Sequence, residues 1–348
     1  MIESAMSDPL NTVRQLHRLY ASESEMVDAS RLAYLLGPDV EWSEHEVAEL
    51  WKDAAAASAS GRKTHNHMYV HVPFCKSICS FCNYERLRPS RPELLQEYLE
   101  RCLQSIERIA PSTQTLRFRS LYFGGGTPST LPAKLLDQLL HKLGSHFQWH
   151  KHVSRQFEFD PAILNRRKLE VLHSHGFNRF SFGLQTLDAA VNQAHNRGPQ
   201  GLRIIEQRFK EFAELNIEDV ACDVLLGLQG TTPEQMLAEI TTIVSEFRPA
   251  VLDIFMVTPT HDYVRRHFAG EFSQFWEHLR QFETYIPPRL PELAERYGYE
   301  LRQGQGHHMC LSRPILREAK FAYAQQIQGP GHPINLLGIG PSARSAIF

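Results

Sequence analysis

The sequence predicts an α/β protein built as a partial, open barrel of six strand–helix units after an N-terminal helical appendage. Short segments rich in β-branched and aromatic residues alternate six times with segments of helical periodicity. This alternation is typical of parallel strands joined by right-handed crossovers. Because six units are too few to close an eight-stranded barrel, we expect an open, TIM-like (βα)6 arrangement.

The composition is that of an ordinary globular protein. The chain has 348 residues, of which 42% are apolar, and its 37 basic and 39 acidic residues nearly balance. These values exclude collagen-like, coiled-coil and largely disordered classes, and without a Lys/Arg block we expect no nucleic-acid partner. No apolar stretch approaches the length of a membrane span, and no secretion signal is visible. We therefore expect a cytoplasmic protein without a membrane partner.

Three regions follow one another along the chain. Residues 1–65 are expected to form the helical extension, in which Ser43 and Glu46 have the spacing of a capping box. The segment 54–61 is rich in alanine and is interpreted either as a linker or as a continuation of the preceding helix. Residues 66–285 are expected to form the barrel, and the less regular residues 286–348 to close or flank it.

The six expected strands are short and apolar. Between them, apolar residues recur at helical spacing, as in Leu95, Leu99, Cys102 and Ile106. Thr232 before Pro233 and Glu234 is a further helix start signal. The strands are expected at 68–74, 120–123, 156–159, 179–182, 219–226 and 251–257.

Three of the six cysteines lie on one loop directly after the first strand, in Cys75-Lys-Ser-Ile-Cys79-Ser-Phe-Cys82. Parallel α/β folds build their sites at this end of the strands. Thiolates are the usual ligands of iron–sulfur clusters, and three of them leave one iron of a 4Fe-4S cube without a protein ligand. The alternative is a structural zinc site that adds His71 or another histidine, although structural zinc usually takes paired Cys or Cys/His knuckles.

The motif Tyr69-Val-His-Val-Pro-Phe-Cys-x3-Cys-x-Phe-Cys82 resembles the opening of the radical S-adenosylmethionine (SAM) superfamily. Within it, the chain is most similar to the branch of the oxygen-independent coproporphyrinogen III oxidases, which also includes class C methyltransferases and heme chaperones. Further matching motifs follow in order. They are Tyr122-Phe-Gly-Gly-Gly-Thr-Pro-Ser129, Glu158-Phe-Asp-Pro161, Gly176-Phe-Asn-Arg-Phe-Ser-Phe-Gly-Leu-Gln185, Asn196-Arg197, Asp223-Val-Leu-Leu-Gly-Leu228 and, weakly, Leu337-Gly-Ile-Gly-Pro-Ser-Ala343.

The resemblance implies a 4Fe-4S cluster, one or two molecules of SAM and a reductant such as flavodoxin or ferredoxin. SAM would chelate the open iron and be cleaved to a 5′-deoxyadenosyl radical, with Tyr69, Glu158 and Arg197 taking part in the chemistry. The implied cluster ligands are Cys75, Cys79 and Cys82, and the implied SAM contacts are Tyr69, Phe81, Gly124, Gly125, Gly126, Thr127, Glu158, Gln185, Arg197, Asp223 and Thr258.

Several of these residues also have plain structural interpretations. The glycine triplet could form a tight turn without a ligand, and Glu158 or Asp223 could form an ion pair with Arg197 or Arg179. Cys102 and Cys222 are expected to be inert core residues. Cys310 follows His307 and His308 in the irregular C-terminal part, where metal or heme ligation is a weaker hypothesis.

Three functions stay open for a small-molecule substrate that is heteroaromatic or porphyrin-like. Compared with the oxidases, this chain has Asn83 and Tyr84 in place of Gly-Cys, Gln229 in place of proline and Arg344 in place of a small residue. These departures, and the early end of the chain, favour a tailoring enzyme such as a C-methyltransferase over a porphyrinogen oxidase. A heme chaperone, with His307 and His308 as candidate ligands, is the alternative that is not an enzyme.

Overall fold

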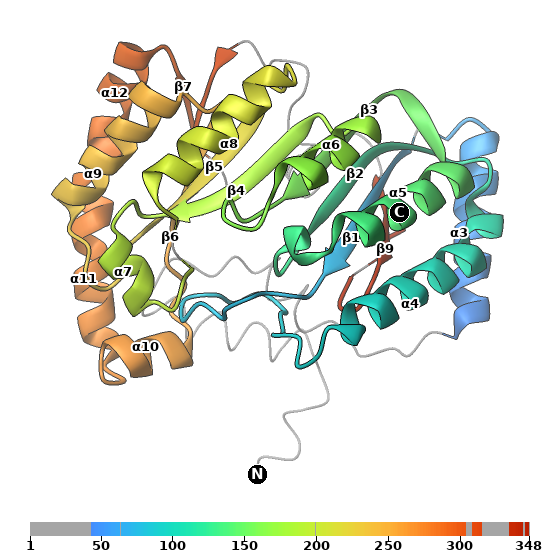
Figure 1. Cartoon of the computed structure of the whole chain (residues 1–348), viewed down its shortest axis with the longest axis horizontal. Coiled ribbons are helices and arrows are strands. Elements are labelled where there is room, and N and C mark those ends of the chain that lie inside the picture. Colours follow the sequence, from blue (N-terminus) through green and yellow to red (C-terminus); the bar gives the residue numbers. More distant parts are fainter. Residues whose placement is uncertain are drawn as a thin grey trace.

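One mixed sheet organises the part of the chain that the computed structural model describes, which is residues 43–348 apart from 63, 199, 304–307, 315–333, 344 and 348. Its strand order is β7-β8-β6-β5-β4-β3-β2-β1-β9, so β7 and β9 form two separate edges and the sheet stays open. Strands β1 to β6 are parallel neighbours in sequence order, which confirms the predicted open (βα)6 arrangement (Figure 1).

The strands lie at the predicted places with partly different bounds, since β1, β2 and β3 begin earlier than predicted and β4 ends later. All six predicted strands are present, and 219–226 has the predicted bounds. The strands are β1 (His65–Val72), β2 (Arg117–Gly125), β3 (Gln148–Glu158), β4 (Arg179–Gln185), β5 (Asp219–Leu226), β6 (Val251–Met256), β7 (Glu300–Gln303), β8 (Met309–Ser312) and β9 (Ile334–Ile339).

Helices follow the strands as the crossover pattern requires, and Figure 1 shows them along one side of the sheet. Thr232 caps its helix by accepting from the Gln235 amide, as its sequence signal predicts. The α-helices are α3 (Glu44–Ala59), α4 (Glu93–Ile109), α5 (Ala133–His146), α6 (Arg166–Ser174), α7 (Ala189–Ala194), α8 (Leu202–Glu214), α9 (Pro233–Thr242), α10 (His261–His267), α11 (Phe272–Tyr285) and α12 (Leu290–Tyr297).

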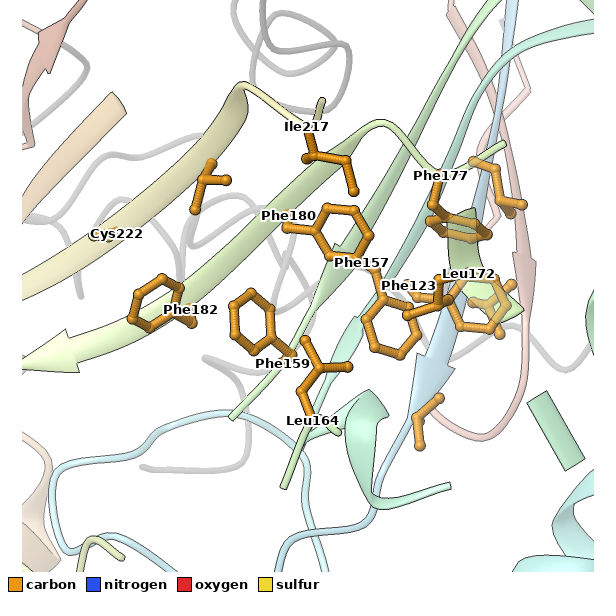
Figure 2. Packing of buried hydrophobic residues seen from close by; sticks show 14 of the residues in the cluster. Phe123, Phe157, Phe159, Leu164, Leu172, Phe177, Phe180, Phe182, Ile217 and Cys222 are labelled. Carbon is orange, nitrogen blue, oxygen red and sulfur yellow. The ribbon is translucent and has the colours of Figure 1, made fainter. Parts of the chain in front are cut away.

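The two faces of the sheet differ in chemistry because side chains alternate along each strand. One face, here called the helical face, is apolar and packs against the helices. Figure 2 shows its aromatic centre, where the rings of Phe159 and Phe182 lie 4.8 Å apart. The opposite face, here called the polar face, carries Tyr69, Tyr122, Glu158, Arg179, Asp223 and Asp253, which the strand registers place on one side.

The N-terminal part of the described chain belongs to the main core. Ser43 and Glu46 form the predicted capping box, and α3 continues to Ala59, so the segment 54–61 is mostly helix and the linker interpretation is wrong. Trp51 is fully buried and packs in the same apolar cluster as the barrel strands. The helices predicted before residue 43 lie outside the described residues.

The C-terminal part is more regular than its sequence suggests. Strand β8 pairs antiparallel with β6, and β9 pairs parallel with β1, which places residues 334–339 beside the first strand. These strands have only four to six residues, too few for a clear period in the sequence. The described strands of this region, β7, β8 and β9, therefore extend the sheet at both edges.

Candidate active site

The carboxyl ends of β1 to β6 bring most of the predicted site residues to one end of the sheet. Parallel strands end at the same edge, so loops that follow different strands meet there. The loop after β1 carries the three cysteines, the turn after β2 carries the glycines, and Glu158 and Gln185 are the last residues of β3 and β4. The segment Asn196–Arg197 reaches the same edge, since Asn196 donates to the Ile78 carbonyl at 2.8 Å.

The cysteine loop is held at its start by backbone hydrogen bonds. The Cys75 amide donates to the Leu87 carbonyl at 3.0 Å, and the Leu87 amide donates to the Pro73 carbonyl at 2.7 Å. Thr127 Oγ1 donates to Cys75 Sγ at 3.4 Å. Burial is the main cause that raises the pKa of Cys75, while the bond from Thr127 lowers it. A metal centre would reverse this balance, because it binds the thiolate form.

Arg197 links the cysteine loop to the neighbouring strands. Its Nη1 lies 3.9 Å from Cys79 Sγ, and its Nη2 donates to the Gly183 carbonyl at 2.5 Å. Burial raises the pKa of Cys79, and the guanidinium charge is the largest opposing cause. The buried Nε of Arg197 has no hydrogen-bond partner. An unsatisfied buried donor beside a thiol fits a site that receives an anionic group.

The loop is also held by a chain of hydrogen bonds that the sequence did not suggest. Ser80 Oγ lies 2.9 Å from His195 Nδ1 and 2.8 Å from His267 Nε2, and His195 Nε2 lies 2.9 Å from the Gln229 carbonyl. A carbonyl only accepts, so His195 carries its proton on Nε2 and accepts from Ser80 at Nδ1. Ser80 Oγ then accepts from His267 Nε2.

Burial keeps both imidazoles that bond to Ser80, those of His195 and His267, in the neutral form. It lowers the pKa of His267 to about 4 and lowers that of fully buried His195, in each case as the largest cause. These hydrogen bonds join the cysteine loop to the segment after α7 and to α10, which are distant from the loop in sequence. The position of Ser80 between two of the predicted cysteine ligands is the one signal in the sequence for these hydrogen bonds.

The glycine turn after β2 fits closely against the loop after β1. A Cβ at Gly125, which has φ +112°, would lie 2.7 Å from the His71 ring, and one at Gly126 would lie 2.8 Å from the Pro73 backbone. A Cβ at Gly124 would meet the Tyr122 ring at 2.6 Å. The triplet therefore has a packing role at all three positions, and this role stands beside the predicted contact with SAM.

Glu158 and Asp223 are half-buried carboxyl groups on the polar face. Tyr122 donates a short hydrogen bond to Glu158, and the Gly125 amide also donates to it. Burial nevertheless raises the pKa of Glu158 to about 7. Burial and the charge of Asp253 hold the pKa of Asp223 well above its usual range. Carboxyl groups in such surroundings are suited to a cationic ligand group that restores their charge.

The structural alternative for these acids has partial support at Asp223. Arg179 forms an ion pair with Asp219, at 3.6 Å, where β4 and β5 begin, and Arg197 bonds the Gly183 carbonyl. The charges of Arg197 and Arg179 nevertheless lower the pKa of Asp223, although burial outweighs them. The zinc alternative is weak, because His71 uses both ring nitrogens, Nδ1 with Tyr69 at 3.0 Å and Nε2 with the Glu85 carbonyl at 3.0 Å. Within the described ranges, no group of three or more His, Cys, Asp or Glu residues, the three cysteines of the loop included, converges on the position of one metal ion. An iron–sulfur cube binds each thiolate at a different iron, so it does not need such convergence.

The other predicted residues lie around this edge or in the core. Phe81 is buried beside the His195 ring, Gln185 has a positive φ of 65°, and Thr258 is an exposed residue just after β6. Cys102 and Cys222 are buried, as expected of core residues. Cys310 is buried within β8, so the irregular segment predicted there is wrong, and His307 lies outside the described residues.

Comparison with known proteins assigns the family. Residues 69–243, half of the chain, match the model of the Radical SAM superfamily. The chain belongs to the radical SAM superfamily. The match spans the cysteine loop, the glycine turn and β2 to β5, which are the elements that build the edge described above.

Relatives within this superfamily include oxidases and a chaperone. The chain is 28% identical over 212 residues to the oxygen-independent coproporphyrinogen III oxidase of Salmonella typhimurium, covering 60% of this chain and 46% of that enzyme. It is 25% identical over 241 residues to the heme chaperone HemW of Bacillus subtilis, covering 69% and 60%. The chain thus spans about half the length of the curated relatives that it matches.

The fold is shared with a solved radical SAM enzyme. Coproporphyrinogen III oxidase (HemN) from Escherichia coli superimposes with a TM-score of 0.69 at 24% identity, over 88% of this chain and 68% of that one. This likeness shows the fold. No helix in the described part of the chain is both long and apolar enough to cross a membrane.

The radical SAM family implies a 4Fe-4S cluster and SAM, and the residues present fit both. Three cysteines share one loop, and Thr127 and Arg197 direct donors at two of their sulfur atoms. The unpaired Arg197 Nε and the raised pKa values of Glu158 and Asp223 fit the carboxylate and the polar groups of an amino-acid nucleotide.

Proposed function

We propose that this radical SAM chain reductively cleaves SAM at a cluster held by Cys75, Cys79 and Cys82. When bound, the reduced cluster supplies the electron that breaks the sulfonium and gives a 5′-deoxyadenosyl radical. The observation that carries the proposal is the meeting of the cysteine loop, the Arg197 side chain and the carboxyl group of Glu158 at one strand edge.

The residues of the chain have separate tasks in this proposal. Arg197 would bind the carboxylate of SAM and keep a donor near Cys79, while the Gly124–Gly126 turn lets the ligand approach the backbone. Glu158, oriented by Tyr122, would accept hydrogen bonds from the amino or ribose groups. Tyr69 packs against Tyr122 with ring centroids 5.7 Å apart and would limit water around the sulfur atoms. Phe81, Thr127, Gln185, Asp223 and Thr258 are the further proposed contacts.

We further propose that the radical serves C-methylation or a related tailoring of a heteroaromatic or tetrapyrrole substrate. The oxidase and chaperone relatives handle coproporphyrinogen and heme by their names, which supports a flat, nitrogen-rich ring system. Asn83 and Tyr84 stand where the oxidases carry Gly-Cys, and Tyr84 is 65% exposed on the loop after the cysteines. A side chain this exposed next to the site is available to a substrate.

Product analysis tests the cleavage. The protein is reconstituted anaerobically with iron and sulfide and reduced with dithionite in the presence of SAM, and 5′-deoxyadenosine is measured. We expect Cys75→Ala, Cys79→Ala and Cys82→Ala each to abolish the product. Cys102→Ala is the matched control, because its thiol is buried on α4 away from the loop. Equal activity in all four variants would contradict the ligand assignment.

The same assay separates the three functions. Methyl transfer gives both S-adenosylhomocysteine and 5′-deoxyadenosine from SAM, whereas oxidative decarboxylation of a porphyrinogen gives 5′-deoxyadenosine and carbon dioxide. A heme chaperone binds heme tightly and gives neither product above a slow background. We expect the first pattern with an accepted substrate, and carbon dioxide release from coproporphyrinogen III would assign the chain to the oxidases instead.

A further inference from the structure

A second guanidinium, that of Arg86, belongs to the segment that directly follows the cysteine loop. The backbone on each side of this residue is held against the end of β1. The Glu85 carbonyl accepts from His71 Nε2 at 3.0 Å, and the Leu87 carbonyl accepts from the Cys75 amide at 3.0 Å. The backbone of Arg86 is therefore fixed beside the first predicted cluster ligand.

The side chain of Arg86 carries a positive charge that no acidic group of the described residues balances. Its Nη1 donates to the Tyr84 carbonyl at 2.6 Å, which is an uncharged acceptor, and no described carboxylate forms an ion pair with it. Its Nε is buried and has no hydrogen-bond partner. A buried donor without a partner, on a backbone that is fixed on both sides, indicates a group that the site receives.

The charge of Arg86 acts on the sulfur atom of Cys75. It is one of the causes that lower the pKa of this thiol against the effect of burial. The charge of Arg88, two residues further along the chain, is not among the causes that shift the pKa of Cys75 or Cys79. Arg88 is also exposed. The two arginines are therefore a matched pair, of which only Arg86 acts electrostatically on a predicted ligand.

We propose that the Arg86 guanidinium is a permanent positive charge beside the Cys75 ligand and raises the reduction potential of the cluster. One-electron reduction adds a negative charge to a cluster that three thiolates already make anionic, so a nearby cation favours the reduced form. Arg197 differs, because in the proposed function the SAM carboxylate balances its charge. The inference rests on that function, and Arg86 lies outside the motifs that carry the family resemblance.

The midpoint potential of the cluster tests the effect of this charge. The full chain is reconstituted anaerobically with iron and sulfide, without SAM or substrate. It is then titrated with titanium(III) citrate while electron paramagnetic resonance measures the reduced cluster. A unit charge about 10 Å from a second one, at an effective dielectric constant of about 20, changes an equilibrium constant by roughly tenfold. We therefore expect Arg86→Gln to lower the potential by about 59 mV, a tenfold change for one electron.

Two further variants separate the charge of Arg86 from its hydrogen bonds. Arg86→Lys keeps the charge but not the guanidinium, and it should change the equilibrium constant for reduction by about twofold at most. Arg88→Gln is the matched control and should leave the potential unchanged, because that side chain is exposed. An unshifted potential in Arg86→Gln, an equal shift in Arg88→Gln, or an equal shift in Arg86→Lys would each overturn the proposal.

Iron content and SAM cleavage give the remaining outcomes. If Arg86→Gln retains no iron while Arg86→Lys does, the cluster needs the charge and the proposal is supported. Loss of iron from both variants would overturn it, since the bond to the Tyr84 carbonyl would then account for the effect. Formation of 5′-deoxyadenosine by the same wild-type preparation is measured after SAM is added. A shifted potential without cleavage refutes the proposed function alone, cleavage with an unshifted potential refutes the role of Arg86 alone, and wild-type protein that takes up no iron refutes both.

Discussion

At the scale of single residues, Glu158 is the group whose chemistry depends most on its surroundings. The residue ends β3 beside the glycine turn and accepts from Tyr122 and from the Gly125 amide. These two bonds favour the charged form, but burial outweighs them and raises the pKa from 4.5 to about 7. Without a ligand, the folded protein therefore binds a proton here more tightly than the unfolded chain does.

This raised pKa predicts a pH-dependent stability of the ligand-free protein. Between pH 4.5 and 7 the folded state binds more protons at Glu158 than the unfolded state does. The free energy of unfolding therefore falls as the pH rises through this range, by up to about 3 kcal/mol from this group. We expect Glu158→Gln to remove this part of the dependence. Urea unfolding at pH 5 and pH 8 measures it, and an equal pH dependence in wild type and variant would refute the raised pKa.

The sequence predicted site residues only where a short motif carried them. The cysteine loop and the glycines lie in local patterns whose chemistry can be interpreted from their spacing, whereas the role expected of Arg197 comes from the family resemblance. The bond between His308 and Asp253 joins residues 55 apart, across an antiparallel pair that the sequence did not indicate. Pairings of this kind depend on tertiary register, which single-sequence periodicity does not contain.

At the scale of elements, the turn after β2 and the loop after β1 form one interlocked unit. The Gly126 amide donates to the Val72 carbonyl at 2.8 Å, and the Pro73 backbone closes the space that a side chain at Gly126 would need. We therefore expect Gly126→Ala to displace the cysteine loop and to lower both iron content and the free energy of unfolding.

A second glycine gives the matched control. Gly144 lies inside α5 with nothing within 4 Å of an added Cβ. Gly144→Ala should stabilise the protein by about 0.5–1 kcal/mol, because alanine loses less backbone entropy in a helix. Iron analysis and urea unfolding of both variants check the pair, and a neutral effect of Gly126→Ala on both would contradict the interlocked turn.

The two hydrogen bonds of Ser80 are expected to hold the cysteine loop in position. Ser80→Ala removes the donor to His195 and the acceptor from His267, leaving two imidazole nitrogens unpaired at a cost of about 1–3 kcal/mol. We expect faster loss of iron from the reconstituted protein to a chelator. Ser174→Ala is the control, since its hydroxyl bonds only within its own helix at the surface. Identical rates of iron loss from wild type and Ser80→Ala would show that these hydrogen bonds do not stabilise the loop.

Strand prediction succeeded where a short segment is mostly apolar and buried. The run 219–226 gave the bounds of β5, whereas β3 begins at Gln148, eight residues before the predicted start. The part before the predicted start, Gln-Trp-His-Lys-His-Val-Ser-Arg, is mostly polar and partly exposed, so no apolar run marks it in the sequence. Tertiary pairing with β2 makes it a strand.

At the scale of the whole molecule, α3 and the barrel share one core. The predicted domain boundary at residue 65 makes the N-terminal region an appendage. A substitution of Trp51 tests whether that region folds separately from the barrel. Its ring is fully buried among barrel residues. We expect Trp51→Ala to destabilise the entire described fold by about 3–5 kcal/mol in one cooperative transition.

Leu50 is the adjacent control, because it is 38% exposed on the same helix, and Leu50→Ala should cost far less. Thermal unfolding followed by near-ultraviolet circular dichroism measures both. A separate early transition in Trp51→Ala, with the remaining signal unchanged, would instead support an independently folding N-terminal region.

The parallel pairing of β9 with β1 imposes an order of events during biosynthesis. Residues 334–339 leave the ribosome long after residues 65–72. In the nascent chain, the strand that precedes the cysteine loop therefore has one edge unpaired until β9 is made. Metal loading on translating polysomes would meet a loop whose supporting strand still lacks a neighbour. The cysteine loop therefore gains the full support of its strand only after residues 334–339 have been synthesised.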